Sequence, residues 1–515
     1  MRTTHFAMGS MLLLAACGKG GDAADTTATA EVGPATTAPA TPDAAAATPD
    51  AAAATPDAAA ATDVATGPAK FYRARIEMPG DLVVTANVTL RGETGTMDIP
   101  LQHLEKAPVA KAVANDSEIA FSFQPPGAPP GVELRFSAKK NADKPGFSGE
   151  VDQMGMKLPL TVEALASEAD FVLKRPQTPQ PPFAYKTEEV KVPVAGAELA
   201  CTLSLPEGTG PHPAMVFFSG SGAQDRDETI FEHKPFLVLS DALVKAGIAT
   251  LRCDDRGVGG STGTMQGADL AIFAADGKAE VDFLAARADI DKAHIGALGH
   301  SEGGMVVGQL GKDAGLAFVV TLSGPARSGR EVSLHQNMQT LASQGVSADK
   351  MGDIEKALDA LFTAVADDKD DPELQTKADA LADAVIAAKK ADDPQEMPPK
   401  EALAGHFMKL AQDPWLKSWV KAKPAAALAA LKVPVLALFG EKDSQVPGED
   451  HAVVLKKAFD GAKKKNGEVE LIAGANHLFQ AAATGKLSEY ETIEETMQPT
   501  VIERITTWVK KQVGK

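Results

Sequence analysis

A serine flanked by glycines occurs at residues 299–303, where the chain reads Gly-His-Ser-Glu-Gly. Gly-x-Ser-x-Gly between a strand and a helix is typical of a nucleophile elbow, a turn too tight for a Cβ at either glycine. The apolar runs Ile295–Leu298 before it and Met305–Val307 after it fit such a strand and helix. The sequence therefore predicts that Ser301 is a nucleophile held in a strained backbone conformation.

A serine hydroxyl becomes a strong nucleophile only when a base takes its proton, and ten histidines are available for that role. Where a triad is built around such an elbow, the chain order is serine, then acid, then histidine. Two late apolar runs, Val433–Phe439 and Val469–Ile472, predict strands; Asp443 follows the first and His477 follows the second. Asp443 would orient the imidazole, and His477 would carry the proton.

Other acids and histidines near these positions compete for the same roles. We prefer Asp443 because it lies just beyond its strand, and His477 because it follows the next strand. The rival acids are Glu441, Glu449 and Asp450, and the rival base is His451. The remaining histidines, including His300, are interpreted as structural or solvated.

Attack on a carbonyl also needs two backbone N–H donors for the oxyanion that forms. The N–H of Glu302, directly after the serine, is the first candidate. The second is expected from the loop Ser219–Gly222, with Ser221 as first choice and Gly220 or Gly222 next. The alternative for this loop is a surface turn with no role in the reaction.

The elements that must position these residues alternate between strands and helices after residue 185. Ala214–Phe218 and Gly247–Arg252 predict buried strands. Apolar residues at helical spacing predict helices between and after them: Phe236, Leu239 and Leu243, then Val281, Leu284 and Ile290, and near the C-terminus Ile502, Ile505, Trp508 and Val509. Such alternation predicts a parallel sheet covered by helices on both faces, with the site at the carboxyl ends of the strands.

The segment from about residue 69 to 175 has a different period. Apolar residues alternate with mostly polar ones, as in Leu82–Leu90 and Met156–Val162, and turn signals separate the runs. We expect an antiparallel sheet curled around one apolar face, as a small sandwich or half-barrel. Because it lacks a cluster of chemically reactive residues, a scaffold or substrate-shaping role is expected. The proline-rich stretch Pro176–Pro182 marks its boundary with the catalytic domain, 176–515.

Four segments in order resemble the α/β-hydrolase superfamily, in particular bacterial serine carboxylesterases with a β-rich N-terminal domain and a helical cap. They are Ser219–Glu228, Asp254–Gly263, Gly299–Gly304 and Gly440–Asp443. The resemblance runs from about Arg175 to Lys511, and Asp98–Gln102 and Gly149–Gln153 extend it more weakly into the β-rich domain. It implies an α/β-hydrolase fold with a mostly parallel sheet flanked by helices, and an esterase activity that needs no cofactor and no metal.

In this architecture, the long acidic insertion at about 325–428 is where a helical cap forms. Phe407, Trp415 and Trp419 are candidates for lining a substrate pocket beneath it, or for anchoring the core of the cap; we favour the core.

The N-terminus predicts export and attachment to a membrane. Residues 1–17 are typical of a short signal peptide, and Leu14–Cys17 resembles the lipobox of bacterial lipoproteins, in which Cys17 is acylated. The absence of an acidic residue after Cys17 favours the outer membrane over the inner. Residues 18–68 repeat Thr-Pro-Asp-Ala-Ala-Ala-Ala, and proline every seven residues breaks each alanine run, so a disordered tether is predicted.

Composition narrows the possible functions. With 51 basic and 69 acidic residues the formal charge is −18, which argues against nucleic acid as a partner. Three cysteines exclude a disulfide-rich scaffold and a cysteine-rich metal protein. Cys201 and Cys253 lie in two predicted strands, where either a bridge or two separate buried thiols would fit.

We therefore expect a membrane-anchored serine hydrolase that cleaves small-molecule carboxylic esters through an acyl-enzyme. A prolyl-oligopeptidase-like peptidase, an acyltransferase or a thioesterase could use the same triad. A hypothesis from another class is a catalytically retired lipoprotein that binds ligands in the envelope; the intact elbow and triad argue against it. The sequence carries no signal for an oligomeric state.

Overall fold

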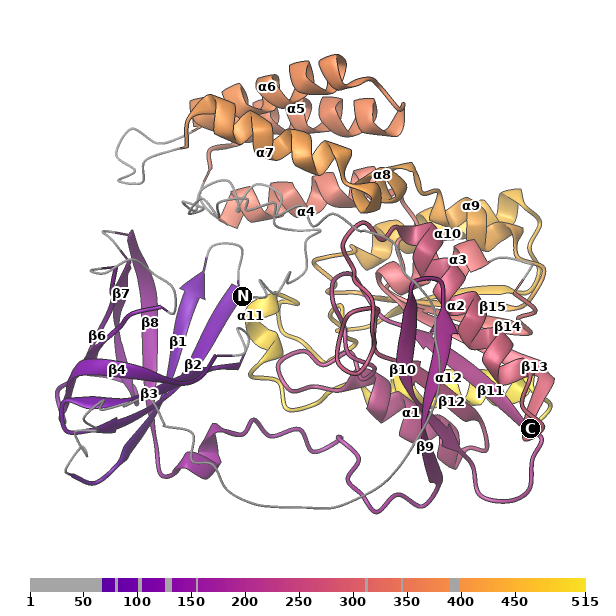
Figure 1. The fold of residues 1–515 in the computed structure, drawn as a ribbon, viewed down its shortest axis with the longest axis horizontal. Helices are drawn as coiled ribbons and strands as arrows, with labels where there is room; N and C mark the ends of the chain where they lie inside the picture. The colour runs from indigo at the N-terminus through magenta and orange to yellow at the C-terminus, as the bar shows by residue number, and fades with distance from the viewer. Residues whose placement is uncertain are drawn as a thin grey trace, which may run out of the picture.

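The computed structural model describes residues 67–515, apart from 79–81, 101–103, 126–131, 154–155, 311–313, 344–345 and 389–397. The predicted signal peptide with Cys17, and the predicted tether as far as residue 66, lie outside the described residues. The described chain forms a β barrel, an α/β body and a layer of helices above the body (Figure 1). In this part of the chain, no helix is both long and apolar enough to cross a bilayer.

The N-terminal domain is a closed eight-stranded barrel. Each strand pairs with the next along the chain, and β1 also pairs antiparallel with β8, which closes the sheet. Closure corrects the expected sandwich or half-barrel. The alternating apolar residues turn inward, where side chains such as Val88, Met97 and Phe121 form one core. The strands are β1 (Lys70–Met78), β2 (Leu82–Arg91), β3 (Thr94–Ile99), β4 (Leu104–Ala114), β5 (Glu118–Phe123), β6 (Leu134–Lys140), β7 (Phe147–Gln153) and β8 (Met156–Leu165).

The body contains an eight-stranded sheet in the order β16-β15-β14-β13-β11-β12-β10-β9. Pairing is parallel from β16 to β12 and antiparallel where β10 joins β12 and β9, so the sheet is mostly parallel, as predicted. Cys201 and Cys253 face each other in β10 and β12 and form a disulfide, which resolves the choice between a bridge and two thiols. The strands are β9 (Lys186–Val194), β10 (Ala197–Leu205), β11 (His212–Phe218), β12 (Ala249–Cys253), β13 (Ile290–His300), β14 (Phe318–Leu322), β15 (Val435–Gly440) and β16 (Gly467–Ile472).

Helices cover both faces of this sheet. Apolar side chains of α1 (Pro235–Lys245) and α12 (Pro499–Gln512) share one hydrophobic cluster with one face of the strands. The other face packs against α2 (Leu270–Ala285), α3 (Glu302–Leu310), α9 (Pro424–Ala430) and α10 (Gly448–Gly461). Trp508 and Val509 are buried, as the predicted C-terminal amphipathic helix requires. Ile290 does not belong to the helix predicted with Val281, because α2 ends at Ala285 and Ile290 begins β13.

In the described part of the insertion between β14 and β15, helices α4 to α8 form the cap (Figure 1). Its apolar core is continuous with that of the α2/α3 face, so the cap is packed onto the body. α9 packs mainly on α3 and α10, so we place the end of the cap at Lys421, before the predicted residue 428. The cap helices are α4 (Gly329–Ser343), α5 (Ala348–Ala366), α6 (Asp371–Ala388), α7 (Lys400–Gln412) and α8 (Pro414–Lys421).

The barrel meets the body at α11 (Leu487–Tyr490), which lies between them in Figure 1. Directly after α11, the Oε2 atom of Glu491 accepts a hydrogen bond from Thr85 Oγ1 on β2 at 2.6 Å and lies 3.5 Å from Arg75 Nε on β1. Glu491 is 3% exposed, so this polar contact between the two domains is shielded from water.

Candidate active site

Ser301 occupies the turn between β13 and α3, with a φ of +50°, a conformation that costs free energy for a residue with a side chain. The glycines around it leave no room for a Cβ. One on Gly299 would lie 2.1 Å from the Gly303 carbonyl oxygen, and one on Gly303 would lie 2.1 Å from the Phe218 carbonyl oxygen. The backbone N–H of Ser301 donates to Leu322 O on β14 at 2.9 Å, which ties the turn to the sheet. This is the geometry predicted for the elbow.

Asp443 and His477 are in direct contact. Asp443 Oδ2 lies 2.7 Å from His477 Nδ1, and Asp443 Oδ1 accepts the backbone N–H groups of Gln445 at 2.9 Å and Val446 at 2.8 Å. Burial alone would raise the pKa of Asp443, but His477 and the N–H of Val446 hold it below its ordinary value. An ionised Asp443 accepts from Nδ1–H, which leaves His477 Nε2 free to take a proton.

The rival residues are occupied elsewhere. Glu441 accepts the N–H of Gly474 at 2.7 Å, Glu449 is exposed, and Asp450 pairs with Arg327. His451 is buried, and its Nδ1 accepts the N–H of Ala326 at 2.9 Å. Burial lowers the pKa of His451 to about 4, so it is neutral at physiological pH.

The three predicted triad residues come from one edge of the sheet. Ser301 follows β13, Asp443 follows β15, and His477 follows β16, and all three strands run parallel. The ring centroids of His477 and His300, which precedes the serine, are 4.7 Å apart. Among the described residues no hydrogen bond joins Ser301 to His477; catalytic hydrogen bonds are often long in enzymes without substrate.

The predicted oxyanion loop lies against the nucleophile. A Cβ on Gly220 would be 3.3 Å from the Cβ of Ser301. The N–H of Gly220 itself donates to Glu228 Oε1 at 2.6 Å, so Gly220 is not an available oxyanion donor, which corrects that expectation. Glu302 begins α3, and the N–H groups of a first helical turn have no partner within the helix. Glu302 and Ser221 therefore remain as candidate donors, with Gly222 next to them.

A buried pair formed by Glu228 and His300 supports this arrangement. Glu228 Oε1 lies 2.8 Å from His300 Nδ1, and His300 Nε2 donates to the His477 carbonyl oxygen at 3.0 Å. Burial by itself would lower the pKa of His300, but the Glu228 carboxylate raises it above the ordinary value. The His300 ring and the Glu228 carboxylate therefore connect the elbow with the loop of Gly220 and with the loop of His477.

The interpretation of His300 as a structural residue agrees with its contacts, whereas the sequence assigns no role to Glu228. One feature of the sequence could have pointed to this role of Glu228: it is a carboxylate in the loop that follows β11, within the segment Ser219–Glu228.

The three cap aromatics differ in their surroundings. Phe407 and Trp419 are buried in the core of the cap, as favoured from the sequence. Trp415 is only partly buried, and its Nε1 donates to Glu302 Oε2 at 2.9 Å.

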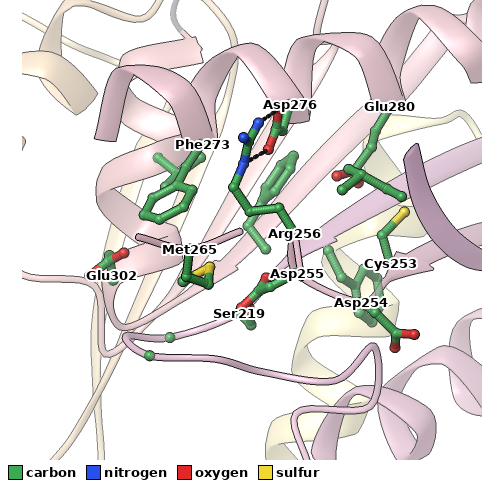
Figure 2. Close-up of a pocket in the computed structure, with 16 residues that line it drawn as sticks. Ser219, Cys253, Asp254, Asp255, Arg256, Met265, Phe273, Asp276, Glu280 and Glu302 are labelled. Carbon is green, nitrogen blue, oxygen red and sulfur yellow. Dashed lines mark hydrogen bonds and ion pairs between the residues drawn. The ribbon is translucent and has the colours of Figure 1, made fainter. Parts of the chain in front are cut away.

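Behind the oxyanion loop, a cavity of about 50 Å³ lies between the sheet and helices α2 and α3 (Figure 2). This volume is enough for a few water molecules. Ser219, Asp255, Glu280 and Glu302 are among its lining residues, and Arg256 forms an ion pair with Asp276 at its wall. Of the described residues that line it, none belongs to the predicted triad.

Three carboxyl groups of this cavity, those of Asp255, Glu280 and Glu302, are held in their neutral forms more readily than usual. Burial raises the pKa of Asp255 to about 8, raises that of Glu302 to about 7, and places that of Glu280 well above its ordinary value. The Asp255 oxygens contact Ser219 Oγ at 3.2 Å and the N–H of Gln224 at 2.9 Å.

Comparison with known proteins gives a family and one curated relative. Residues 195–474 match the family described as X-Pro dipeptidyl-peptidase (S15 family). Over 329 residues the chain is 27% identical to Esterase EstD of Thermotoga maritima, an alignment that covers 63% of this chain and 68% of EstD.

Two solved structures align with this chain at lower sequence identity than EstD does. Est1E from Butyrivibrio proteoclasticus has a TM-score of 0.37 and 17% identity, covering 64% of this chain and 99% of Est1E. The alpha/beta hydrolase GrgF from Penicillium sp. sh18 has a TM-score of 0.39 and 15% identity, covering 64% of this chain and 100% of GrgF.

Proposed function

The chain belongs to the X-Pro dipeptidyl-peptidase (S15) family, and from that premise we propose that it is a serine hydrolase that cleaves carboxylic esters through an acyl-enzyme. The observation that carries this proposal is the contact of Asp443 with His477 at 2.7 Å, on the same sheet edge as the strained Ser301. The similarity to EstD, which is described as an esterase, supports ester over amide as the scissile bond.

In the proposed reaction, Ser301 Oγ attacks the ester carbonyl carbon while His477 Nε2 takes the hydroxyl proton. The oxyanion that forms accepts hydrogen bonds from the N–H groups of Glu302 and Ser221. When the tetrahedral intermediate collapses, the alcohol leaves with the proton from His477, and the acyl group stays on Ser301. A water molecule activated by His477 then attacks the acyl-enzyme and releases the acid. No step needs a metal or an organic cofactor.

A fluorophosphonate probe tests the nucleophile directly, because it reacts covalently with activated serines. We expect wild-type protein to be labelled and Ser301→Ala to be neither labelled nor active on p-nitrophenyl esters. Unchanged esterase activity in Ser301→Ala would refute the proposed mechanism. Absent labelling in a folded wild type would favour a retired hydrolase that binds ligands.

A second candidate, cleavage of X-Pro peptide bonds, is favoured by the name of the matched family. Turnover of p-nitrophenyl esters of two to eight carbons, measured beside aminoacyl-prolyl p-nitroanilides, separates the two. We expect kcat/KM to be much higher for the esters. Efficient cleavage of the anilides without an ester preference would identify a peptidase. Transfer of the acyl group to added alcohols would identify an acyltransferase, and faster turnover of thioesters than of esters would identify a thioesterase.

We also propose that the protein is exported and held on a membrane, at the outer rather than the inner membrane, through lipid on Cys17. The disulfide between Cys201 and Cys253 supports export, because such bonds persist in oxidising compartments. Metabolic labelling with an alkyne fatty acid tests the anchor: wild type should be labelled, and Cys17→Ser should not.

A further inference from the structure

The side chain of Glu302 lies where three parts of the protein meet. Its Oε2 atom accepts a hydrogen bond from Ser221 Oγ in the oxyanion loop at 2.9 Å. The same atom accepts the indole N–H of Trp415, on cap helix α8, also at 2.9 Å. Glu302 itself begins the helix after Ser301 and is 4% exposed. One carboxyl oxygen therefore joins the nucleophile elbow, the oxyanion loop and the cap.

These two contacts bear on the chemical step. Ser221 offers its backbone N–H as a candidate oxyanion donor, and its hydroxyl is bound to Glu302. An oxyanion donor must lie within a few tenths of an ångström of its productive position, since a small misplacement weakens stabilisation of the transition state. Glu302 is thus hydrogen-bonded both to the residue that offers this candidate N–H and to a tryptophan of the cap.

We propose that Glu302 is a positioning residue that couples docking of the cap to the geometry of the oxyanion hole. Trp415 then acts on the reaction through Glu302 and Ser221, and not by lining the acyl pocket. This inference rests on the proposed function, because it requires Ser301 as nucleophile and Ser221 as an oxyanion donor.

The chain offers a matched control in Trp419. Its ring stacks on that of Trp415, with centroids 5.2 Å apart and an interplanar angle of 19°. Its Nε1, however, donates within the cap, to the Gly329 carbonyl oxygen at 2.9 Å and to Ser333 Oγ at 3.0 Å. Replacing either tryptophan by phenylalanine removes one indole N–H from the same helix, but only Trp415→Phe breaks the contact with Glu302.

The first experiment compares Trp415→Phe with Trp419→Phe on p-nitrophenyl acetate, butyrate and octanoate. Acylation and deacylation both pass through an oxyanion, so kcat should fall whichever step limits the rate. We expect Trp415→Phe to lower kcat about tenfold on all three esters, the effect of one lost hydrogen bond, with KM nearly unchanged. Trp419→Phe should keep kcat within about twofold of wild type. A loss that grows with acyl length and falls on KM would assign Trp415 to the pocket and overturn the proposal.

A double-mutant cycle tests whether Trp415 acts through Ser221. If the proposal holds, Trp415→Phe made in a Ser221→Ala background lowers kcat by no more than about twofold, because the link to the loop is already lost. Full additivity of the two losses would overturn the coupling.

Variants at Glu302 complete the test without changing either tryptophan. Glu302→Gln keeps an acceptor oxygen at the same place and should lose less kcat than Glu302→Leu, which is of similar size and should lose at least as much as Trp415→Phe. Equal losses in the two variants would overturn the proposal. This comparison also decides the matter if Trp415→Phe does not fold.

Fluorophosphonate labelling distinguishes failure of this inference from failure of the proposed function. If wild type is not labelled at Ser301, both are refuted. If wild type and all variants are labelled but Trp415→Phe and Trp419→Phe have equal kcat, only the coupling is refuted.

Discussion

At the scale of single residues, Asp443 shows how a carboxylate orients a catalytic imidazole. Two backbone donors of the turn after β15 hold Oδ1, and His477 Nδ1, from the loop after β16, contacts Oδ2, so both oxygens are bound. An ionised side chain is required, because an amide in its place would present N–H to Nδ1 and favour the wrong tautomer of the imidazole.

Asp443→Asn should therefore lower kcat about 10⁴-fold on p-nitrophenyl esters while leaving the fold intact. The measurement is steady-state turnover, with far-UV circular dichroism as a check on folding. Asp450→Asn serves as the control, because Asp450 is an exposed carboxylate paired with Arg327 and should be replaced with little effect on kcat. Similar losses in the two variants would contradict the assignment of Asp443.

The sequence could predict Ser301, Asp443 and His477 because each follows a strand whose apolar run is visible. It could not assign Glu228, which lies 72 residues before His300 in the chain and meets it only when the loop after β11 folds back over the elbow. Nor could it separate Gly220 from Ser221, because the choice depends on which N–H Glu228 already holds.

Glu280 carries a pH-dependent cost to stability. It is buried on α2, its Oε2 has no hydrogen-bond partner among the described residues, and burial raises its pKa well above 4.5. Because the folded-state pKa lies above that of the unfolded chain, the folded state binds more protons between the two values. Glu280 therefore lowers the free energy of unfolding very little below about pH 4.5. Its cost to stability grows as the pH rises from there through its folded-state pKa.

Glu280→Gln should remove part of this loss. We expect thermal unfolding of wild type to shift to lower temperature from pH 6 to pH 9, and the variant to gain several degrees over wild type at the upper end, about 2–4 °C per kcal/mol recovered. The exposed Glu503→Gln is the control and should follow wild type at every pH. A variant that melts in parallel with wild type would show that Glu280 is already ionised in both the folded and the unfolded state at pH 6, and that its folded-state pKa is not raised as argued.

At the scale of elements, the elbow depends on how closely α3 approaches β11. Gly303 lies in the first turn of α3, and a Cβ there would meet the carbonyl oxygens of both Phe218 and Ser219, at 2.1 and 2.8 Å. Those carbonyls belong to the end of the strand and the start of the oxyanion loop, so the clash cannot be relieved by moving a side chain.

Gly303→Ala should consequently cost at least about 3 kcal/mol of unfolding free energy, because the backbone of the strand or of the helix must move. Gly405, in the middle of α7, offers the opposite case, since a Cβ there meets nothing within 4 Å. Gly405→Ala should stabilise the protein by about 0.5–1 kcal/mol. Denaturant titration measures both, and equal effects at the two positions would contradict the argument.

The strands and helices of the body were predictable because their buried faces leave clear patterns, such as the uninterrupted apolar run in β11. Closure of the N-terminal barrel was not, because it depends on pairing Phe71 with Leu165 across the whole domain. Alternating residues look the same in an open sheet and in a barrel. The helical cap was predictable as an insertion, but the contact of Trp415 with Glu302 spans 113 residues and no local pattern indicates it.

At the scale of the whole molecule, one arginine joins the linker, the barrel contact and the body. Arg175 donates to the Phe231 carbonyl oxygen from Nε at 3.0 Å and from Nη2 at 2.8 Å. It also donates to the carbonyl oxygens of Glu491 at 2.9 Å and Ile493 at 3.1 Å. Since the Glu491 side chain holds the barrel through Thr85 and Arg75, Arg175 secures the segment on which the barrel rests.

Arg175→Ala should therefore loosen the barrel from the body. The substitution leaves several partly buried carbonyl oxygens without their charged donor, which should lower the free energy that holds the barrel on the body by at least about 2 kcal/mol. The proline-rich linker 176–182 then becomes accessible to proteases. We expect faster proteinase K cleavage into a barrel fragment and a body fragment, while activity on p-nitrophenyl esters persists because the predicted triad lies wholly in the body. Arg135→Ala, which breaks an exposed ion pair with Asp152 on the barrel alone, should leave the cleavage rate unchanged. If both variants resist cleavage as wild type does, the domains are held together by contacts other than the one through Arg175.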